Sequence, residues 1–332
     1  MYSRVVGTGS FLPQNRVDNN ELAARLAKDG IETSGEWIRT RTGIEARYFA
    51  DVSKGETTTA MAVGAARRAL EMAKLDGADV DLIIVATTSS DMVFPSVACH
   101  VQAQLGAAGC AAFDVQAVCA GFIYALNVAD AMLRVGPYKT ALVVGAETLS
   151  RLLDMKDRST CVLFGDGAGA VVLKADEEPG ILAARMYADG RYDENVLGLS
   201  ARVDSGQVCG DPFIRMDGRQ VFKLAVEGLT NSAIDVAELA GVKTEDVALF
   251  VPHQANLRIM SMVAKKLGID EEKMVKAVAE HGNTSAASVP LALDSAVRAG
   301  RVGSGDLVLL QGVGAGMAWG SALVRWTLDV QH

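Results

Sequence analysis

Residues 114–126 read DVQAVCAGFIYAL, and this stretch decides the fold because it places one cysteine between a strand and a helix. The run before the cysteine is strand-like, and the apolar spacing after it predicts a largely buried helix that ends at Gly136. Cys119 then lies at the helix N-terminus, where unpaired backbone N–H groups and the helix dipole favour the nucleophilic thiolate. The alternative is a small, inert core cysteine.

The length and composition of the chain are those of a globular protein with a sizeable core. It has 332 residues, of which 50% are hydrophobic, and no apolar run approaches the roughly 20 residues of a membrane span. Residues 1–7 lead directly into a strand-like run and lack the features of a secretory signal. We therefore expect a soluble, cytoplasmic protein that does not bind membranes.

The cysteines and the net charge exclude further classes of protein. The cysteines are five in number and lack CxxC spacing, which argues against a disulfide framework and against a zinc site. Reduced thiols and no metal are expected for Cys99, Cys110, Cys119, Cys161 and Cys209. A net charge of −8 argues against nucleic-acid binding but leaves room for a local basic patch that faces an acidic protein.

Helical and strand-like patterns alternate along the chain. The predicted elements are strands at residues 3–7, 80–87 and 141–145, helices at 57–74 and 96–105, and two short strands within 160–173. The glycine turn at 165–169 is followed by neither GK[ST] nor a helix, so it is neither a phosphate loop nor a dinucleotide fingerprint. Residues 174–180 are the best candidate for a linker.

The sequence also repeats itself. Residues 81–86 resemble 246–251 at an offset of 165, and residues 130–136 resemble 294–300 at an offset of 164. The glycine turn at 165–169 likewise resembles residues 312–316. We therefore predict two copies of one α/β unit, residues 1–174 and 175–332, with mostly parallel sheets covered by helices.

The repeat predicts a site between the two copies. The offset of 164 places Asn283 opposite Cys119, and His253 follows the apolar strand at 247–251. Ligands collect at the carboxyl ends of strands in α/β sheets, so the three side chains should meet in one cleft. A thiol nucleophile with imidazole and carboxamide donors suits acyl transfer. The alternatives are that His253 and Asn283 only cap secondary structure, or that His281 is a rival imidazole.

Specific motifs are spread over nearly the whole chain, and they are EWI at 36–38, RTGI at 41–44, VCAGF at 118–122, FGDGAGA at 164–170, PHQANLRI at 252–259, GNTSAASVP at 282–290 and WGSALV at 319–324. With these motifs the chain resembles the bacterial β-ketoacyl-acyl carrier protein synthase III family. The resemblance implies a thiolase-like fold with two pseudo-symmetric halves in α-β-α-β-α layers. It also implies that acetyl-CoA acylates Cys119 and that malonyl-acyl carrier protein is then decarboxylated and condensed to acetoacetyl-acyl carrier protein, which initiates type II fatty-acid synthesis.

The resemblance assigns further residues and requires no cofactor, since acetyl-CoA is a substrate. The backbone of Cys119, Ala315 and Gly316 would form an oxyanion hole. CoA would contact Thr33, Trp37, Arg41, Arg158, Phe222 and Asn256. An acyl carrier protein would contact Gln254, Ala255, Asn256, Leu257, Arg258, Lys223, Lys265 and Lys266. The family is homodimeric, and Phe94 would close the acyl pocket of the partner subunit. Without this context, residues 33–44 suit either a surface for a flat anion or a helix with a basic face.

Related enzymes differ at single positions. Elongating synthases have a second histidine where this chain has Asn283, and thiolases have a second cysteine that the loop at 312–317 lacks. The alternatives that remain are a specialised condensing enzyme of secondary metabolism, a type III polyketide synthase-like enzyme, and a non-catalytic partner subunit.

Overall fold

The first sheet is built from the N-terminal half of the chain. The computed structural model describes residues 1–192 and 195–328. The strand order is β1-β7-β6-β4-β5, and the bounds are β1 Tyr2–Phe11, β4 Leu82–Ala86, β5 Ala111–Val115, β6 Thr140–Glu147 and β7 Gly167–Asp176. Strands β4, β5 and β6 are parallel, whereas β7 is antiparallel to both β6 and β1. Runs such as LIIVA in β4 are wholly buried, as expected for a sheet covered on both faces.

The second sheet is built from the C-terminal half. Its order is β13-β14-β15-β8, and the bounds are β8 Ile181–Tyr192, β13 Leu249–Val251, β14 Leu307–Gly314 and β15 Gly316–Arg325. Only β13 and β14 are parallel, so the prediction of mostly parallel sheets is wrong. Strands β14 and β15 are joined by Ala315 alone, and a connection that short makes the pair antiparallel. We propose residues 1–174 and 175–332 as the two structural halves.

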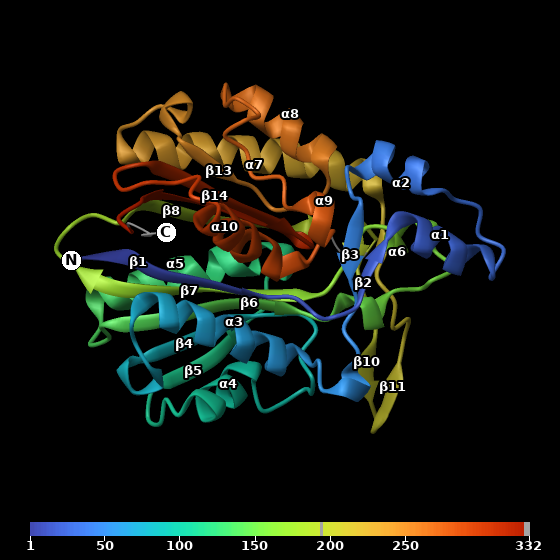
Figure 1. The fold of residues 1–332 in the computed structure, drawn as a ribbon, viewed down its shortest axis with the longest axis horizontal. Coiled ribbons are helices and arrows are strands. Elements are labelled where there is room, and N and C mark those ends of the chain that lie inside the picture. The colour runs from blue at the N-terminus through green and yellow to red at the C-terminus, as the bar shows by residue number, and fades with distance from the viewer. Residues whose placement is uncertain (193–194, 329–332) are drawn as a thin grey trace.

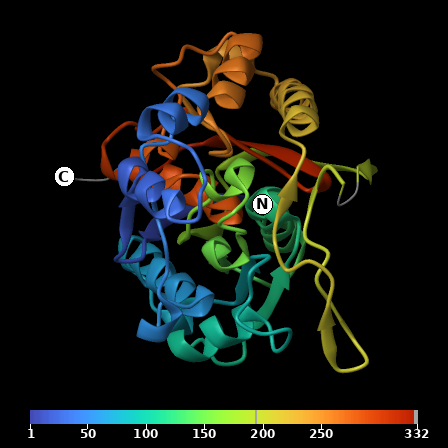
Figure 2. The same cartoon turned by 90° about the vertical axis from the view of Figure 1, so that its right-hand side faces the viewer.

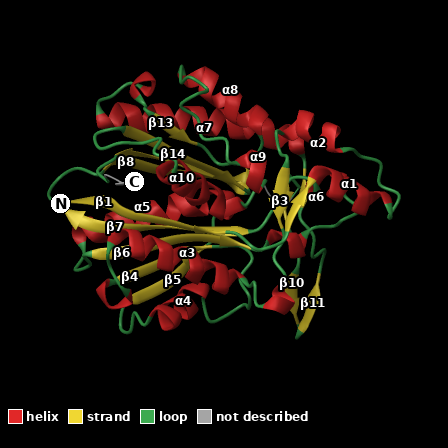
Figure 3. Ribbon diagram, in the orientation of Figure 1, coloured by secondary structure: helices red, strands yellow, loops and turns green. Residues whose placement is uncertain are grey.

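Helices complete a five-layered α-β-α-β-α arrangement, which Figures 1 and 3 show edge-on. Helices α3 (Thr58–Ala73) and α4 (Val97–Leu105) cover the outer face of the first sheet. The middle layer holds α5 (Gly121–Val135) and α10 (Ser288–Arg298), and the outer layer beyond the second sheet holds α7 (Gly218–Ala240) and α8 (Leu257–Leu267). The fold predicted from the sequence is therefore confirmed.

The register of the two halves differs from the predicted offsets. Leu82 of β4 pairs with Ala141 of β6, and Leu249 of β13 pairs with Val308 of β14, so the strands repeat with an offset of 167 residues. The single-turn helices η3 (Val118–Ala120) and η6 (Ser285–Ala287), which precede α5 and α10, repeat with the same offset. At the helix ends the predicted offset of 164 holds, because the ion pairs Asp130–Arg134 and Asp294–Arg298 are equivalent.

The difference arises because α10 is about one turn shorter than α5. The structural counterpart of Cys119 is therefore Ala286, and that of Asn283 is Gln116. The prediction that Asn283 is the counterpart of Cys119 in the repeat is therefore wrong. The predicted match between the glycine motifs at 165–169 and 312–316 also changes. When β6 is matched with β14, Gly169 of β7 lies at the position of Gly320 of β15.

Smaller elements gather at one end of the molecule, which Figure 2 views directly. They are β2 Arg16–Asp18, α1 Asn19–Ala27, α2 Gly35–Thr42, β3 Ala46–Tyr48, α6 Arg158–Cys161, β9 Leu197–Gly198, β10 Arg202–Asp204, β11 Gln207–Cys209, β12 Arg215–Met216 and α9 Val278–His281. The β10–β11 hairpin projects from the body. Residues 160–173 were predicted as two strands, but the first part is the turn of helix α6, whose N-cap is Asp157.

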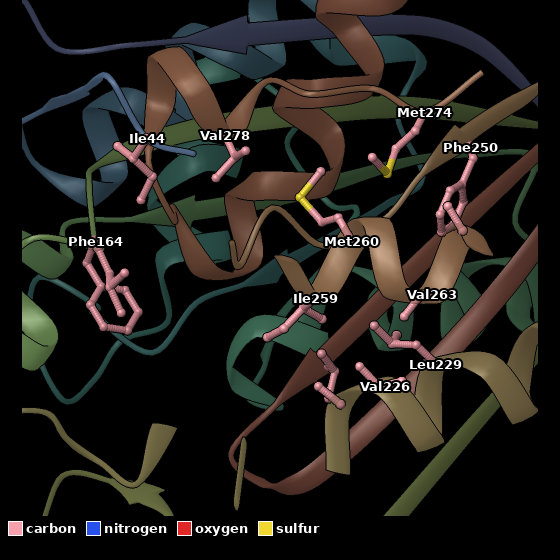
Figure 4. Close-up of a cluster of buried hydrophobic side chains, with 14 of the residues drawn as sticks. Ile44, Phe164, Val226, Leu229, Phe250, Ile259, Met260, Val263, Met274 and Val278 are labelled. Carbon is pink, nitrogen blue, oxygen red and sulfur yellow. The ribbon is translucent and has the colours of Figure 1, made fainter. Parts of the chain in front are cut away.

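The core continues from the middle layer to both outer layers. Figure 4 shows the cluster beneath α7 and α8, where Val226 and Leu229 of α7 meet Ile259 and Val263 of α8. Residues 118–135 are apolar and long enough to cross a membrane by length and composition. In this structure they form the turn before α5 and α5 itself, which packs between the two sheets, so burial in the core accounts for their apolar character.

Candidate active site

Cys119 lies where the first sheet meets the middle layer. Strand β5 ends at Val115, and η3 carries the cysteine into the first turn of α5. Val118 has a φ of 48°, a left-handed conformation that is uncommon for a β-branched residue. The thiol is 4% exposed. The predicted position at a helix N-terminus is therefore confirmed.

Glycines of β14 allow the second half to approach this turn closely. A Cβ atom at Gly314 would lie 2.7 Å from the Cys119 backbone nitrogen, and one at Gly312 would lie 3.0 Å from the Ala120 Cα. Both contacts are with backbone that cannot yield easily. Glycine is needed at these positions so that the two halves can meet at the cysteine.

The predicted predominance of the Cys119 thiolate is wrong for the resting site. Burial, with a smaller contribution from the nearby Glu147 carboxylate, raises the pKa of Cys119 to about 12. A hydrogen bond with the Ser285 side chain and the cysteine's own backbone N–H lower the pKa but do not offset burial. The resting group is the thiol, so its proton must leave when the sulfur attacks a substrate.

His253 follows β13 and is 2% exposed. Its Nδ1 lies 2.6 Å from the Ser288 Oγ, and that hydroxyl also accepts a 3.4 Å hydrogen bond from the Gln254 backbone N–H. A hydroxyl oxygen that already accepts one bond is best placed to donate its proton to Nδ1, which leaves the imidazole proton on Nε2. Burial lowers the pKa of His253 to about 3, so the ring is a neutral hydrogen-bond donor.

Asn283 precedes η6 and is held by backbone on both sides. It forms a β-bridge with Phe164, and its Oδ1 accepts a 2.9 Å hydrogen bond from the Ser285 backbone N–H. A backbone N–H is only a donor, so this bond fixes the orientation of the carboxamide and leaves its NH₂ group for the cavity. Asn283 is thus a second donor.

Cys119, His253 and Asn283 line one cavity of about 70 Å³. The structure therefore brings together the three residues predicted to converge, although Asn283 arrives three residues before the position that the sequence offset gave it. A second, larger cavity of about 640 Å³ adjoins Cys119 and is lined by residues from the loops after β4 and β5, together with Ser285 and Ala315. Ala315 thus lies at the cysteine, whereas Gly316 is exposed and lines neither of these two cavities.

The residues assigned to CoA gather mainly around α2. The Arg158 guanidinium lies 4.4 Å from the centre of the Trp37 ring, and that of Arg41 lies 5.5 Å from it. The nearby Thr33 hydroxyl is buried without a hydrogen-bond partner among the described residues, which suits a polar ligand. Asn256 lines the smaller cavity and caps α8 with its side-chain oxygen, whereas Phe222 lies in a separate groove beside Arg258.

The residues assigned to a carrier protein divide into buried and exposed groups. Gln254 is 1% exposed, and its carboxamide bonds the backbone of Pro252, Val275 and Val278, so its predicted contact with a carrier protein is wrong. Ala255 lines the small cavity and Leu257 is partly buried. The exposed cations assigned to a carrier protein lie on α7 and α8 without salt bridges among the described residues, and they are Lys223, Arg258, Lys265 and Lys266.

Phe94 and His281, which the sequence analysis also singled out, lie outside the two cavities beside Cys119. Phe94 is 81% exposed in the single chain, and the neighbouring Val93 lines the larger cavity. His281 is largely buried, its ring packs edge-on against Tyr48 with 6.3 Å between the ring centres, and its Nδ1 has no hydrogen-bond partner within residues 1–192 and 195–328. It does not line the cavity that contains Cys119, so the structure gives no support to His281 as a rival imidazole.

Sequence reasoning missed three polar residues that surround the cysteine and the histidine. Ser288 bonds His253, Ser285 lies against Cys119, and Glu147 ends the buried strand β6. A signal for Glu147 was present, because a carboxylate directly after the apolar run ALVVGA is unusual for a buried strand. Ser285 and Ser288 carry no such signal, since serines before a helix most often act as caps.

A layered fold of two repeats with this cavity between them is that of a thiolase-fold condensing enzyme. Sequence-family models described as "3-Oxoacyl-[acyl-carrier-protein (ACP)] synthase III" and its "C terminal" part match residues 113–190 and 237–326. The 3-oxoacyl-[acyl-carrier-protein] synthase III of Aquifex aeolicus is 47% identical, with a TM-score of 0.88, over 98% of this chain and 100% of that one.

Two other solved structures are similarly related. The synthase III of Pseudomonas aeruginosa is 39% identical, with a TM-score of 0.91, over the full length of both chains. The priming β-ketosynthase of the R1128 polyketide pathway is 38% identical, with a TM-score of 0.91, over 99% of this chain and 97% of that one. The chain therefore belongs to the 3-oxoacyl-[acyl-carrier-protein] synthase III family and is an acyltransferase.

Proposed function

We propose that Cys119 accepts an acyl group from acetyl-CoA and passes it to the carbanion formed from malonyl-acyl carrier protein. The sulfur attacks the thioester carbonyl and CoA leaves. Loss of CO₂ from the malonyl group then forms an enolate, whose carbon attacks the acyl-cysteine and expels the Cys119 sulfur. The product is acetoacetyl-acyl carrier protein. This reaction would initiate type II fatty-acid synthesis in the cytoplasm.

The observation that carries this proposal is the presence of one thiol and two oriented donors in the same buried cavity. His253 presents a neutral N–H and Asn283 presents its NH₂ group, so both stabilise the negative oxygen of the enolate without adding a charge. The backbone N–H groups of Cys119 and Ala315 are proposed to serve the other negative oxygen, on the acyl carbon.

Both substrates are proposed to bind at the charged end of the molecule. The CoA adenine would stack at Trp37 between Arg41 and Arg158, and the thioester would enter past Asn256. The acidic carrier protein would dock on Arg258 and its neighbouring lysines, because complementary charge steers the encounter of proteins. The family resemblance supports a homodimer in which the exposed Phe94 enters the pocket of the partner subunit.

Intact-protein mass spectrometry tests the first step. Incubation with acetyl-CoA should add one acetyl group, and peptide mapping should place it on Cys119. Cys119→Ser should neither take up the group nor condense, because a hydroxyl at its usual pKa is a poor nucleophile. Acetyl groups mapped to Cys161, the other buried cysteine, would overturn the assignment.

A second candidate is a condensing enzyme that takes longer primers in a specialised pathway, and the larger cavity favours it. An acetyl group has three heavy atoms and needs about 100 Å³ if each takes the volume of a water molecule. The cavity in the single chain is about 640 Å³. The relative from the R1128 pathway supports this second function. Acylation rates with acetyl-, butyryl- and octanoyl-CoA distinguish the two candidates, since ready octanoyl transfer would favour the second.

A further inference from the structure

Glu147 is a buried carboxylate that the proposed reaction leaves without a role. It lies at the end of β6 and is 0% exposed. Its oxygens accept hydrogen bonds from the Thr88 backbone N–H at 3.2 Å, from the Thr88 and Ser89 hydroxyls, and from the Ser285 hydroxyl at 3.1 Å. The backbone N–H can only donate and the hydroxyls can donate, so these partners suit an ionised carboxylate, while burial raises the pKa of Glu147 and thereby favours uptake of a proton.

No cation neutralises this carboxylate among the described residues. The Arg151 guanidinium lies nearby, but it donates to the carbonyl oxygens of Ser89 and Ser90. The Glu147 charge acts on the nearby Cys119 thiol, whose pKa it raises. A buried, unpaired charge is costly, and hydrogen bonds from neutral groups offset only part of that cost. Such a group is a ready acceptor for a proton.

Ser285 connects the carboxylate to the nucleophile. Its hydroxyl donates to Glu147 Oε1 at 3.1 Å, and Ser285 and Cys119 both line the larger cavity, where the Ser285 side chain lowers the pKa of the cysteine. The direction is consistent, because a hydroxyl that donates to the carboxylate has its lone pairs free to accept the thiol proton. Ser285 has a φ of 50°, a conformation that is rare outside glycine and often marks functional positions.

The other polar groups around the sulfur cannot take the proton. His253 carries its proton on Nε2, with Nδ1 already bonded to Ser288, and the Asn283 NH₂ group is a donor. Releasing the thiol proton to solvent would leave two negative charges in the buried site, on sulfur and on Glu147. Moving it to Glu147 keeps the number of buried negative charges at one.

We propose that Glu147 accepts the Cys119 proton through Ser285 during acylation and returns it after condensation. This inference rests on the proposed function. As sulfur bonds to the acyl carbon, its proton moves to Ser285 and the Ser285 proton moves to Glu147. The C–S bond to CoA breaks with its electron pair on the CoA sulfur, which takes a proton from water.

Condensation completes the cycle with no further proton acceptor. The malonyl carboxylate leaves as CO₂ and its electron pair forms the enolate, which attacks the acyl carbon. The bond to the Cys119 sulfur breaks, and the thiolate takes back the proton from Glu147 through Ser285. One proton from solvent is consumed in each cycle, by CoA. Glu147 is neutral while the enolate exists, so the two anions do not repel each other.

The variants that test the relay are Glu147→Gln and Ser285→Ala, each measured in the full-length enzyme. The matched control is Asp294→Asn, because Asp294 is also fully buried and accepts from the Thr8 and Ser10 hydroxyls, but on the far part of α10. The measurement is the single-turnover rate of Cys119 acylation by acetyl-CoA over about pH 6 to 9, by rapid quench and mass spectrometry.

Glu147→Gln and Ser285→Ala should acylate about 10²-fold more slowly than wild type near neutral pH. Their rates should rise about tenfold per pH unit, because only the ionised thiol reacts and solvent must now remove the proton. The wild-type rate should stay nearly constant over that range, and Asp294→Asn should follow the wild-type profile. A merely structural role for Glu147 would not produce this recovery at high pH.

Two results would overturn the relay. The first is acylation of either variant at the wild-type rate and with the wild-type pH profile. The second is a slow rate that stays slow at every pH, which would mean that the substitution only displaces the cysteine. Failure of the wild-type enzyme to acylate Cys119 at all would instead refute the proposed function, so the two failures are distinguishable.

Discussion

The approach of β14 to the cysteine turn predicts the effect of a single methyl group at Gly314. In Gly314→Ala the new Cβ would lie 2.7 Å from the Cys119 nitrogen, 2.9 Å from the Ala117 oxygen and 3.0 Å from the Ala120 nitrogen. All three atoms are backbone, so η3 must move by several tenths of an ångström. Overpacking of this kind costs about 1–3 kcal/mol of folding free energy.

The effect on acylation should be similar in free energy to the effect on stability, since each tenfold loss in rate is about 1.4 kcal/mol. A displacement approaching 1 Å at a reacting atom costs about 10²-fold in rate, so we expect a loss of between about 10-fold and 100-fold. The assays are urea unfolding and single-turnover acylation by acetyl-CoA. Gly190→Ala on β8 is the matched control, because a Cβ there meets nothing within 4 Å. Wild-type acylation by Gly314→Ala would refute the close packing of the two halves at Cys119.

The remaining predictions concern the histidine, the basic surface and the acyl pocket. Ser288→Ala should slow malonyl decarboxylation by about tenfold because the His253 tautomer is no longer fixed. Since the pKa of His253 is about 3, the wild-type decarboxylation rate should show no histidine titration between about pH 5 and 8. Such a titration would contradict the neutral ring. Arg258→Glu with Lys265→Glu should weaken use of malonyl-acyl carrier protein, less so in high salt, while acylation by acetyl-CoA persists; equal loss of both would contradict a carrier-protein surface. Phe94→Ala should admit butyryl-CoA, since each buried CH₂ contributes about 0.8 kcal/mol, and an unchanged preference in an acyl-CoA panel would exclude Phe94 from the pocket.

The sequence predicted the fold and the convergence of three residues for physical reasons that are local. Buried runs such as LIIVA, the helix caps and the internal repeat fix the elements and their layers. The cavity at Cys119, His253 and Asn283 then follows because equivalent loops of the two copies meet at one place. None of this depends on the detailed packing of side chains.

The register and the ionisation of the site could not be predicted in the same way. A repeat read from residues 130–136 cannot show that α10 is about one turn shorter than α5, so Asn283 was matched to the wrong residue. The helix N-terminus at Cys119 suggested a lowered pKa, but burial acts more strongly and is invisible before the packing is known. Burial was equally invisible at Gln254, a polar residue that was assigned to a carrier-protein surface but is buried against the backbone.

The repeat also explains why a thiol and a carboxylate occupy the same small region. The turn η3 of the first half packs on the end of β14, and the turn η6 of the second half packs on the end of β6. At the offset of 167, Cys119 is equivalent to Ala286, and Glu147 is equivalent to Gly314. Where the strand ends in glycine, the facing turn comes close enough to place a cysteine. Where it ends in Glu147, the facing turn offers Ser285 instead. The contact between η3 and β14 thus holds the nucleophile, and the equivalent contact between η6 and β6 holds the proposed acceptor of its proton.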